Sequence, residues 1–171
     1  MSLSMYQASI PGFLRMLGNL SAILHKAEAY AAERKIDPGV LVNARLAPDM
    51  HPLVRQVQIA TDSVKGCGAR LAGIEVPSYA DTESNFAELQ ERIAKTRAFL
   101  QSIDAAQLDG SEGRQITLKF PGAEMTFSGR DYLLGFVLPN FYFHVTTAYA
   151  ILRHKGVELG KRDFLGQLAL V

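Results

Sequence analysis

A histidine and an asparagine four residues apart have the types and spacing that chemistry could use. Asn140 and His144 stand within the otherwise apolar stretch PNFYFHVTTAYAILRHKG. Positions i and i+4 share one face of a helix, and two histidines at this spacing commonly hold a metal ion. The pair could therefore offer a nitrogen and an oxygen to a metal or a ligand. In the alternative that spacing alone favours, His144 bonds Asn140 or a neighbouring backbone group and fixes packing, since asparagine is a poor ligand for soft divalent metals.

The other reactive residue types give weaker signals. His51 stands beside Asp49 at the start of a predicted helix, where a cleft would open, although a solvated histidine is the simpler interpretation. Cys67, the single cysteine, lies on an apolar stripe and is expected in the core. The sequence contains no phosphate-cradling glycine motif, nucleophile elbow or zinc-finger spacing.

Composition and charge exclude several classes of protein. The chain has 171 residues, 48% of them hydrophobic and 20% charged, as expected for one globular domain over residues 1–171. Its net charge is +1 and it has no basic block, so nucleic acid is not an expected partner. No apolar run is long enough to cross a membrane, and the N-terminus lacks the features of a signal peptide. With one cysteine and hence no internal disulfide, we expect a cytoplasmic protein.

Helices are predicted to position these residues. Apolar residues recur at helical spacing over residues 5–31, 51–72, 84–103 and 129–155. Between the last two helices the period changes to alternation in RQITLKF, which is followed by PGAE and MTF and predicts a short β-hairpin. The expected fold is mainly all-α, an up-down four-helix bundle with a hairpin before the last helix.

Capping residues and a proline refine the helix boundaries. Asp81 or Ser84 could cap the third helix. Ser128 is expected to cap the fourth helix, with Asp131 reaching back to it. Pro139 lies inside the fourth helix and should kink it.

The fourth helix is apolar around its whole circumference. Leu138, Tyr142, Val145 and Tyr149 lie on a second face, away from the polar pair. A helix that is apolar all round is buried all round, so this face must be covered by the C-terminal segment FLGQLALV or by a second subunit. We favour a homodimer with these four residues at its interface, because twofold dimers are the commonest assembly.

Three segments of the chain resemble a known family. PNFYFHVTTAYAILRHKGVELGKRDFLG, PDMHPLVRQVQIATDSVKG and FAELQERIAKTRAFL look like the DUF1993 family of uncharacterised bacterial and fungal proteins, and the match covers nearly the whole chain. That family is similar in turn to the DinB/YfiT-like superfamily of proposed metalloenzymes. The resemblance implies an up-down four-helix bundle, often dimeric, in which one second-helix histidine and two histidines in an H-x-x-x-H on the fourth helix bind a divalent metal. Some superfamily members resemble thiol-dependent S-transferases or hydrolases.

Carried over residue by residue, the metal set of the superfamily is incomplete in this chain. The fourth-helix pair falls on Asn140 and His144, of which only His144 is a histidine. The second-helix histidine falls on Gln58, and His51 is an imaginable substitute. Glutamine, asparagine and histidine together make a poor zinc or nickel site.

Three functions follow from these observations. In the first, the metal site is degenerate, with no cofactor or a weakly bound divalent metal, and the cleft of Asn140, His144, Gln58 and His51 binds a small molecule or is structural. In the second, the protein is a divalent-metal-dependent hydrolase or thiol S-transferase, with His144 and Asn140 among the metal ligands. In the third, the second face of the last helix makes the protein an interaction module.

Overall fold

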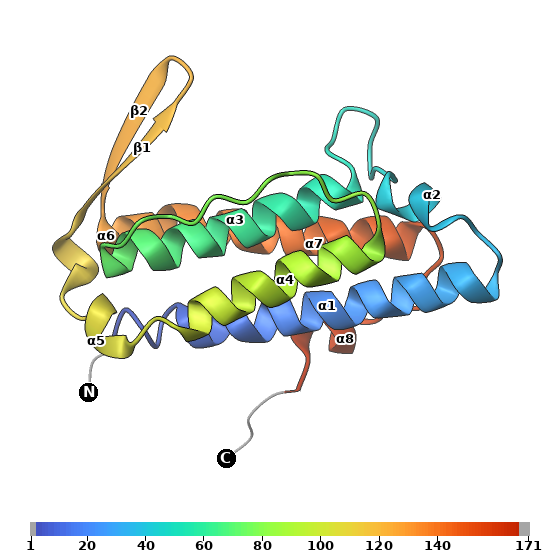
Figure 1. Cartoon of the computed structure of the whole chain (residues 1–171), viewed down its shortest axis with the longest axis horizontal. Coiled ribbons are helices and arrows are strands. Elements are labelled where there is room, and N and C mark those ends of the chain that lie inside the picture. The colour runs from blue at the N-terminus through green and yellow to red at the C-terminus, as the bar shows by residue number, and fades with distance from the viewer. Residues whose placement is uncertain (1–2, 168–171) are drawn as a thin grey trace.

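The computed structural model describes residues 3–167, and it is mainly helical with a two-stranded antiparallel hairpin, as predicted. Long helices lie side by side (Figure 1), and they are α1 (Ile10–Glu33), α3 (Leu53–Ala72), α4 (Phe86–Gln101) and α7 (Leu138–His154). Shorter helices α2 (Pro38–Val42), α5 (Ala105–Leu108) and α8 (Lys161–Leu165) lie in the connections. Among the described residues, no helix combines the length and the apolarity that crossing a membrane requires.

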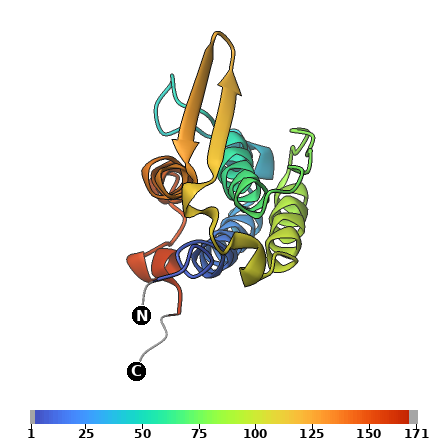
Figure 2. The same ribbon diagram turned by 90° about the vertical axis from the view of Figure 1, so that its left-hand side faces the viewer.

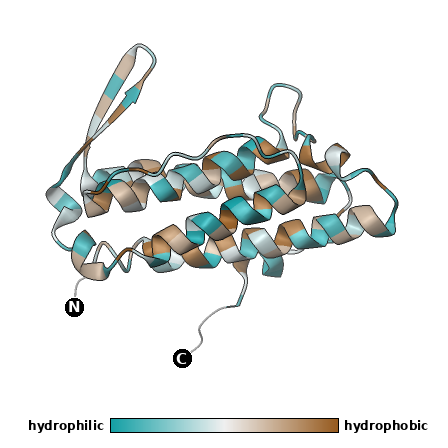
Figure 3. Cartoon of the chain, viewed as in Figure 1, coloured by the Kyte–Doolittle hydropathy of each residue, from teal (hydrophilic) through white to brown (hydrophobic). Residues whose placement is uncertain are grey.

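The apolar stripes that predict the long helices supply the core. Leu17 of α1, Val57 of α3, Ile93 of α4 and Ile151 of α7 are all fully or almost fully buried. Figure 3 shows hydrophilic and hydrophobic residues interspersed along each long helix, as expected for amphipathic helices around one core. Close packing of α3 requires Gly68, because a Cβ there would lie 2.8 Å from the Ile103 side chain.

The directions of the long helices differ from strict up-down alternation. In Figure 1, α1 and α7 run one way, whereas α3 and α4 both run the other way. The connection from α3 to α4, residues 73–85, returns along the length of α3 before α4 begins. This is sterically simple, since α3 is about 30 Å long and 13 extended residues span up to about 45 Å. We call residues 73–85 the crossover.

The structure confirms the predicted cap of the fourth helix and shows that the predicted cap of the third helix was wrong. Ser128 accepts a hydrogen bond from the Asp131 N–H at 3.1 Å, as predicted. The third predicted helix is capped by Asn85, whose side chain accepts from the Glu88 N–H at 3.0 Å. Asp81 cannot serve as the cap, because its carboxylate pairs with arginines, and Ser84 instead bonds the Glu88 side chain.

The predicted fourth helix consists of three consecutive pieces. Helix α6 (Gly129–Asp131) is followed by the π-helical segment η2 (Tyr132–Val137) and then by α7. Pro139 has no N–H for the bond that an α-helix would need there, and π-helical turns accommodate such a disruption. The irregularity that Pro139 predicts therefore lies just before it, as a widened turn.

The hairpin stands beside η2. Strand β1 (Gln115–Phe120) pairs with β2 (Ala123–Ser128), with Leu118 opposite Met125, and the two project away from the helices in Figure 2. At the base of the hairpin, the Phe127 ring packs against Phe136 with ring centroids 5.8 Å apart. The hairpin thus supplies a wall next to the α3–α7 contact.

Candidate ligand-binding cleft

A cleft of about 280 Å³ lies between α3 and α7 and is bounded by η2 and the hairpin. Its lining combines aromatic, aliphatic and polar side chains from four elements. They are Arg55, Ile59, Asp62, Ser63, Arg70, Leu118, Phe120, Tyr132, Phe136, Val137 and Asn140. Of the residues that the sequence predicts for a site, Asn140 is the one that lines this cleft.

Asn140 is held by α3. Its Nδ2 donates to Ser63 Oγ at 2.7 Å, and that hydroxyl donates its own proton to the Ile59 carbonyl at 2.7 Å. Because the single hydroxyl proton is already used, Ser63 can only accept from Asn140, which fixes the orientation of the amide. Within residues 3–167, the Oδ1 atom of Asn140 has no hydrogen-bond partner and can accept one from a ligand.

His144 pairs with a residue that the sequence does not single out. Its Nδ1 lies 2.7 Å from Gln56 Oε1, and Gln56 Nε2 donates to the His51 carbonyl at 2.9 Å. Since Gln56 Oε1 accepts, Nδ1 of His144 carries the proton and Nε2 keeps its lone pair. Burial, followed by the nearby His51 and Arg55, lowers the pKa of His144 to about 4, so the ring is neutral at pH 7.

Gln58 and His51 are engaged elsewhere. Gln58 is buried, donates to Glu83 Oε2 at 2.8 Å, and accepts from Arg55 at 3.2 Å, so it binds the crossover. His51 is exposed and contributes its backbone carbonyl to Gln56. The sequence contains a signal for Gln56, because this residue lies one helical turn from both Leu53 and Ala60 on the apolar stripe of α3.

Comparison with known proteins identifies the family. The family model described as "Domain of unknown function (DUF1993)" matches residues 5–165. The chain belongs to the DUF1993 family. It is also similar to a DinB family member protein from Shewanella denitrificans of known crystal structure, with 41% identity and a TM-score of 0.89 over 97% of this chain and 94% of that one. No curated protein matches the chain. The predicted resemblance to DUF1993 and DinB proteins is therefore confirmed.

The donors of this DUF1993 protein do not fit a divalent metal. Asn140, His144 and Gln58 hydrogen-bond three different protein groups, Ser63, Gln56 and Glu83. Two of the three are neutral amides, which bind zinc or nickel poorly. In the part of the chain that the structure describes, three or more His, Cys, Asp or Glu side chains nowhere gather in a metal-binding group.

The second face of α7 is partly covered by the chain itself. Val145 is completely buried in the core, and the Tyr149 ring packs edge-on against Phe164 of α8 at 6.2 Å. Leu138 and Tyr142 are half-buried. The segment up to Gln167 thus supplies part of the covering expected from FLGQLALV, whose residues 168–171 lie outside the described part of the chain.

The exposed apolar side chains of this region are different from those predicted. Phe143 of α7 is 55% exposed and Leu134 of η2 is 52% exposed. A shallow apolar groove beside Phe143 is lined by Leu46, Pro139, Tyr142, Phe143, Thr146, Thr147 and Ala150. The homodimer stays a prediction, and Phe143 is its most exposed candidate contact on α7.

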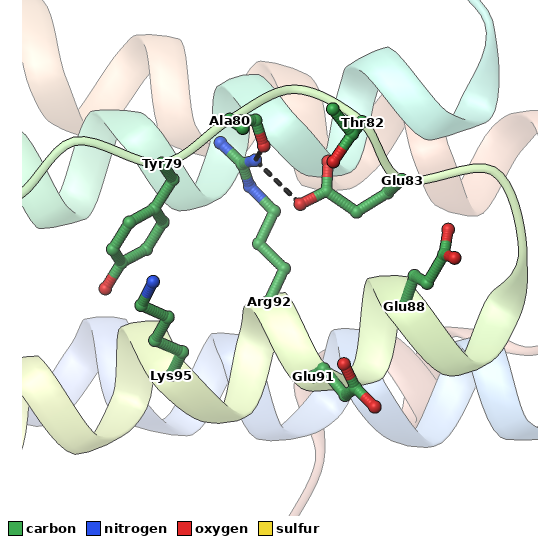
Figure 4. A pocket seen from close by; sticks show the side chains of 8 residues that line it. All are labelled: Tyr79, Ala80, Thr82, Glu83, Glu88, Glu91, Arg92 and Lys95. Carbon is green, nitrogen blue, oxygen red and sulfur yellow. Dashed lines mark hydrogen bonds and ion pairs between the residues drawn. The ribbon is translucent and has the colours of Figure 1, made fainter.

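A second polar cluster lies between α3, α4 and the crossover, and the sequence gives no indication of it. Arg92 is only 3% exposed, although it stands on α4 in an unremarkable charged stretch. Its Nη1 donates to Glu83 at 2.9 Å and to the Ala80 carbonyl at 3.1 Å (Figure 4). Its Nη2 lies 2.9 Å from Asp62 and 3.1 Å from Asp81. We call Arg92 and these three carboxylates the Arg92 cluster.

Three cations face the three carboxylates of the Arg92 cluster, because Arg55 also pairs with Asp81 and Lys65 also pairs with Asp62. Burial alone would raise the pKa of Glu83, yet hydrogen bonds from Arg92 and Gln58 hold it below the usual value. Lys65 and Lys95 place their ammonium groups 3.9 Å and 4.2 Å from the Tyr79 ring centroid, which fixes the crossover further. A cavity of about 330 Å³ lies beside the cluster, and Figure 4 shows the residues that line it. The charges of the cluster itself pair with one another and hold the crossover on α3 and α4.

Proposed function

We propose that this DUF1993 protein binds a small organic molecule in the α3–α7 cleft without a metal ion. One observation carries the proposal: the residues at the superfamily's metal positions are hydrogen-bonded to the protein, while a cleft beside them remains open. A binding cleft with a mostly apolar wall and a few polar groups is the usual form of a small-molecule site. Asn140 Oδ1 and the aromatic side chains of η2 supply those two elements.

The binding half of the proposal is tested by a fragment screen on the whole chain. Neutral and charged fragments of one ring are added to ¹⁵N-labelled protein, and amide shifts are followed by NMR. We expect shifts at Ser63, Phe136 and Asn140, with none at Tyr79 and Lys95, which lie beside Arg92 and do not line the cleft. If no fragment changes the amide shifts of the cleft residues, the proposal is wrong.

The metal half is tested by elemental analysis of protein purified without chelators. We expect well under 0.1 equivalents of zinc, nickel or iron per chain. About one equivalent of any of these metals, lost in an Asn140→Ala or His144→Ala variant, would contradict it.

A second candidate function, a divalent-metal-dependent hydrolase or thiol S-transferase around His144, is favoured by one observation. The contact with Gln56 leaves His144 Nε2 as a lone pair without a partner in the described residues, which is the form that binds metals. If this function holds, His144→Ala abolishes both zinc uptake and any activity that zinc supports. A variant that keeps both would exclude it.

We also propose that residues 1–171 form one four-helix bundle domain of DinB/YfiT-like type and that it forms a homodimer. The similarity to the Shewanella protein over 97% of the chain supports the bundle, and exposed Phe143 and Leu134 support the dimer. Light scattering at tens of micromolar should give twice the chain mass, and Phe143→Ser should shift the protein towards monomer. A monomeric wild-type protein would contradict the dimer.

A further inference from the structure

The charges that line the cleft are not all neutralised. Arg55 forms an ion pair with Asp81, and Asp62 pairs with Lys65 at 2.7 Å and with Arg92. Arg70 differs from these residues. Over residues 3–167, no carboxylate lies within ion-pair distance of its guanidinium, and its one side-chain hydrogen bond runs from Nη1 to Tyr132 Oη at 3.1 Å. The cleft therefore contains one guanidinium without a counter-charge.

Tyr132 adds a second donor beside this guanidinium. Its ring is buried, and its hydroxyl oxygen accepts from Arg70 while its proton has no acceptor in the described residues. Burial, with a smaller contribution from Cys67, raises the pKa of Tyr132 to about 12 against the opposing effect of Arg70. The phenol keeps its proton at pH 7, so Arg70 and Tyr132 together offer N–H and O–H donors to one acceptor.

Gly66 sets the position of the Arg70 side chain. A Cβ at Gly66, one helical turn before Arg70, would lie 2.3 Å from Arg70 Nη1. The guanidinium therefore lies back over α3 in space that only glycine leaves open. Glycine destabilises a helix interior relative to alanine, and the placement of Arg70 gives this glycine a structural role.

An aromatic wall adjoins the donor pair. The Phe136 ring stacks on Tyr132 with centroids 6.0 Å apart, and Phe127 packs against both rings. Leu118 and Phe120 of the hairpin complete the apolar side of the cleft. A flat apolar body would be buried against this wall while an acidic group reached the donors.

We propose that the cleft binds an organic carboxylate with a flat apolar body, whose carboxylate accepts hydrogen bonds from Arg70 and Tyr132. A guanidinium fits a planar carboxylate because it can donate two parallel hydrogen bonds, and such charge-assisted bonds are stronger than neutral ones. This inference rests on the proposed function and adds the chemical class of the ligand.

Benzoate, benzamide and acetate are the probes that test it on the whole chain. Benzamide keeps the ring without the charge, and acetate keeps the charge without the ring. By NMR titration we expect benzoate to bind at the cleft at least about tenfold more tightly than benzamide, as one charge-assisted hydrogen bond provides. We expect it to bind at least about tenfold more tightly than acetate as well, because acetate has no ring to bury against the aromatic wall. Arg70→Gln should remove most of this preference, whereas Arg153→Gln, an equal change of charge on the exposed end of α7, should leave it unchanged.

Gly66→Ala is the sharper variant because it keeps every charge. It should weaken benzoate binding several-fold by displacing the guanidinium, with thermal stability equal to or above that of the wild type. A substitution that only destabilised the fold would lower both the affinity for benzoate and the thermal stability.

The outcomes separate this inference from the proposed function. Equal binding of benzoate and benzamide, equal binding of benzoate and acetate, or unchanged benzoate binding in Arg70→Gln would each overturn the inference and leave the function standing. The same holds if only neutral fragments of the screen bind. If no compound binds in the cleft, the function and the inference fall together.

Discussion

The two polar clusters that flank α3 bury their polar groups in different ways. In the Arg92 cluster a buried guanidinium meets three carboxylates, and every charge has an opposite charge beside it. Around His144 the groups are a neutral imidazole and neutral amides: His144 and Asn140 each have one protein partner, and Gln56 has two. Buried charges need this degree of pairing, whereas neutral groups need only one hydrogen bond each.

This difference indicates which of the two clusters can bind a ligand. In the Arg92 cluster the charged groups hold the crossover in place. The α3–α7 side keeps unused capacity, at Asn140 Oδ1 and His144 Nε2, in or beside an open cleft. Free hydrogen-bonding atoms next to an apolar wall therefore mark the α3–α7 cleft, whereas the charges of the Arg92 cluster are engaged by opposite charges.

The largest effect is expected from Arg92→Met. It leaves Glu83 without its cation and takes one of two cations from Asp62 and from Asp81, and we expect the free energy of unfolding to fall by about 3 kcal/mol. The value is at the low end for a buried charge because the Asp62 and Asp81 side chains are 38% exposed and can hydrate. Urea unfolding measures this loss of stability. Lys95→Met is the control, and we expect it to lower the free energy of unfolding by less than about 1 kcal/mol. A loss below 1 kcal/mol for Arg92→Met would show that other contacts hold the crossover.

A change of pH is expected to have an intermediate effect on stability, through protonation of His144. The pKa of His144 is about 4 in the folded chain and about 6.5 when unfolded, so the unfolded chain takes up the proton first. Stability therefore falls as pH drops from 6.5 towards 4, by about 1–2 kcal/mol between pH 7 and pH 5, allowing for solvent in the cleft. Urea unfolding at the two pH values measures this.

His144→Gln is the control for that pH dependence. It removes the titrating group, and the loss between pH 7 and pH 5 should shrink to the contribution of the other groups. If the variant loses as much stability as the wild type, His144 is not the group that becomes protonated.

The smallest effect is expected from Asn140→Ala. The substitution removes one neutral hydrogen bond at the edge of a solvated cleft, and we expect the free energy of unfolding to fall by about 0.5–1 kcal/mol. Thermal unfolding beside the Arg92→Met variant compares the two sides of α3 directly. A loss as large as that of Arg92→Met would mean that Asn140 is a structural centre and would count against a ligand role.

Periodicity predicts the helices well because each long helix buries one apolar stripe. The predicted ranges 51–72 and 84–103 match α3 and α4 to within two residues at each end. The direction of α4 was not predictable, because apolar periodicity carries no information on whether a connection turns back or crosses over. Residues of the crossover bury Arg92, so its burial could not be predicted without the path of that connection.

The candidate site was predicted only in part. Asn140 does line the cleft, but the partners Ser63 and Gln56 depend on the rotation of α3 relative to α7, which one sequence does not specify. The second face of α7 was misjudged at Val145, which the structure places in the core. A helical wheel centred on Asn140 assumes that the side of α7 carrying Asn140 faces the core. The full burial of Phe141 and Ala148 shows that the side facing the core is rotated away from Asn140.

The π-helical segment η2 absorbs a change in chain length. Its hydrogen bonds close wider turns than those of an α-helix, so it holds an extra residue between α6 and α7 without displacing either. Asn140 therefore stays against Ser63, and Phe143 stays on the exposed side of α7. A one-residue deletion that straightens Tyr132–Val137 is expected to leave α7 in place. A deletion within α7 itself would instead rotate the residues beyond it by about 100°.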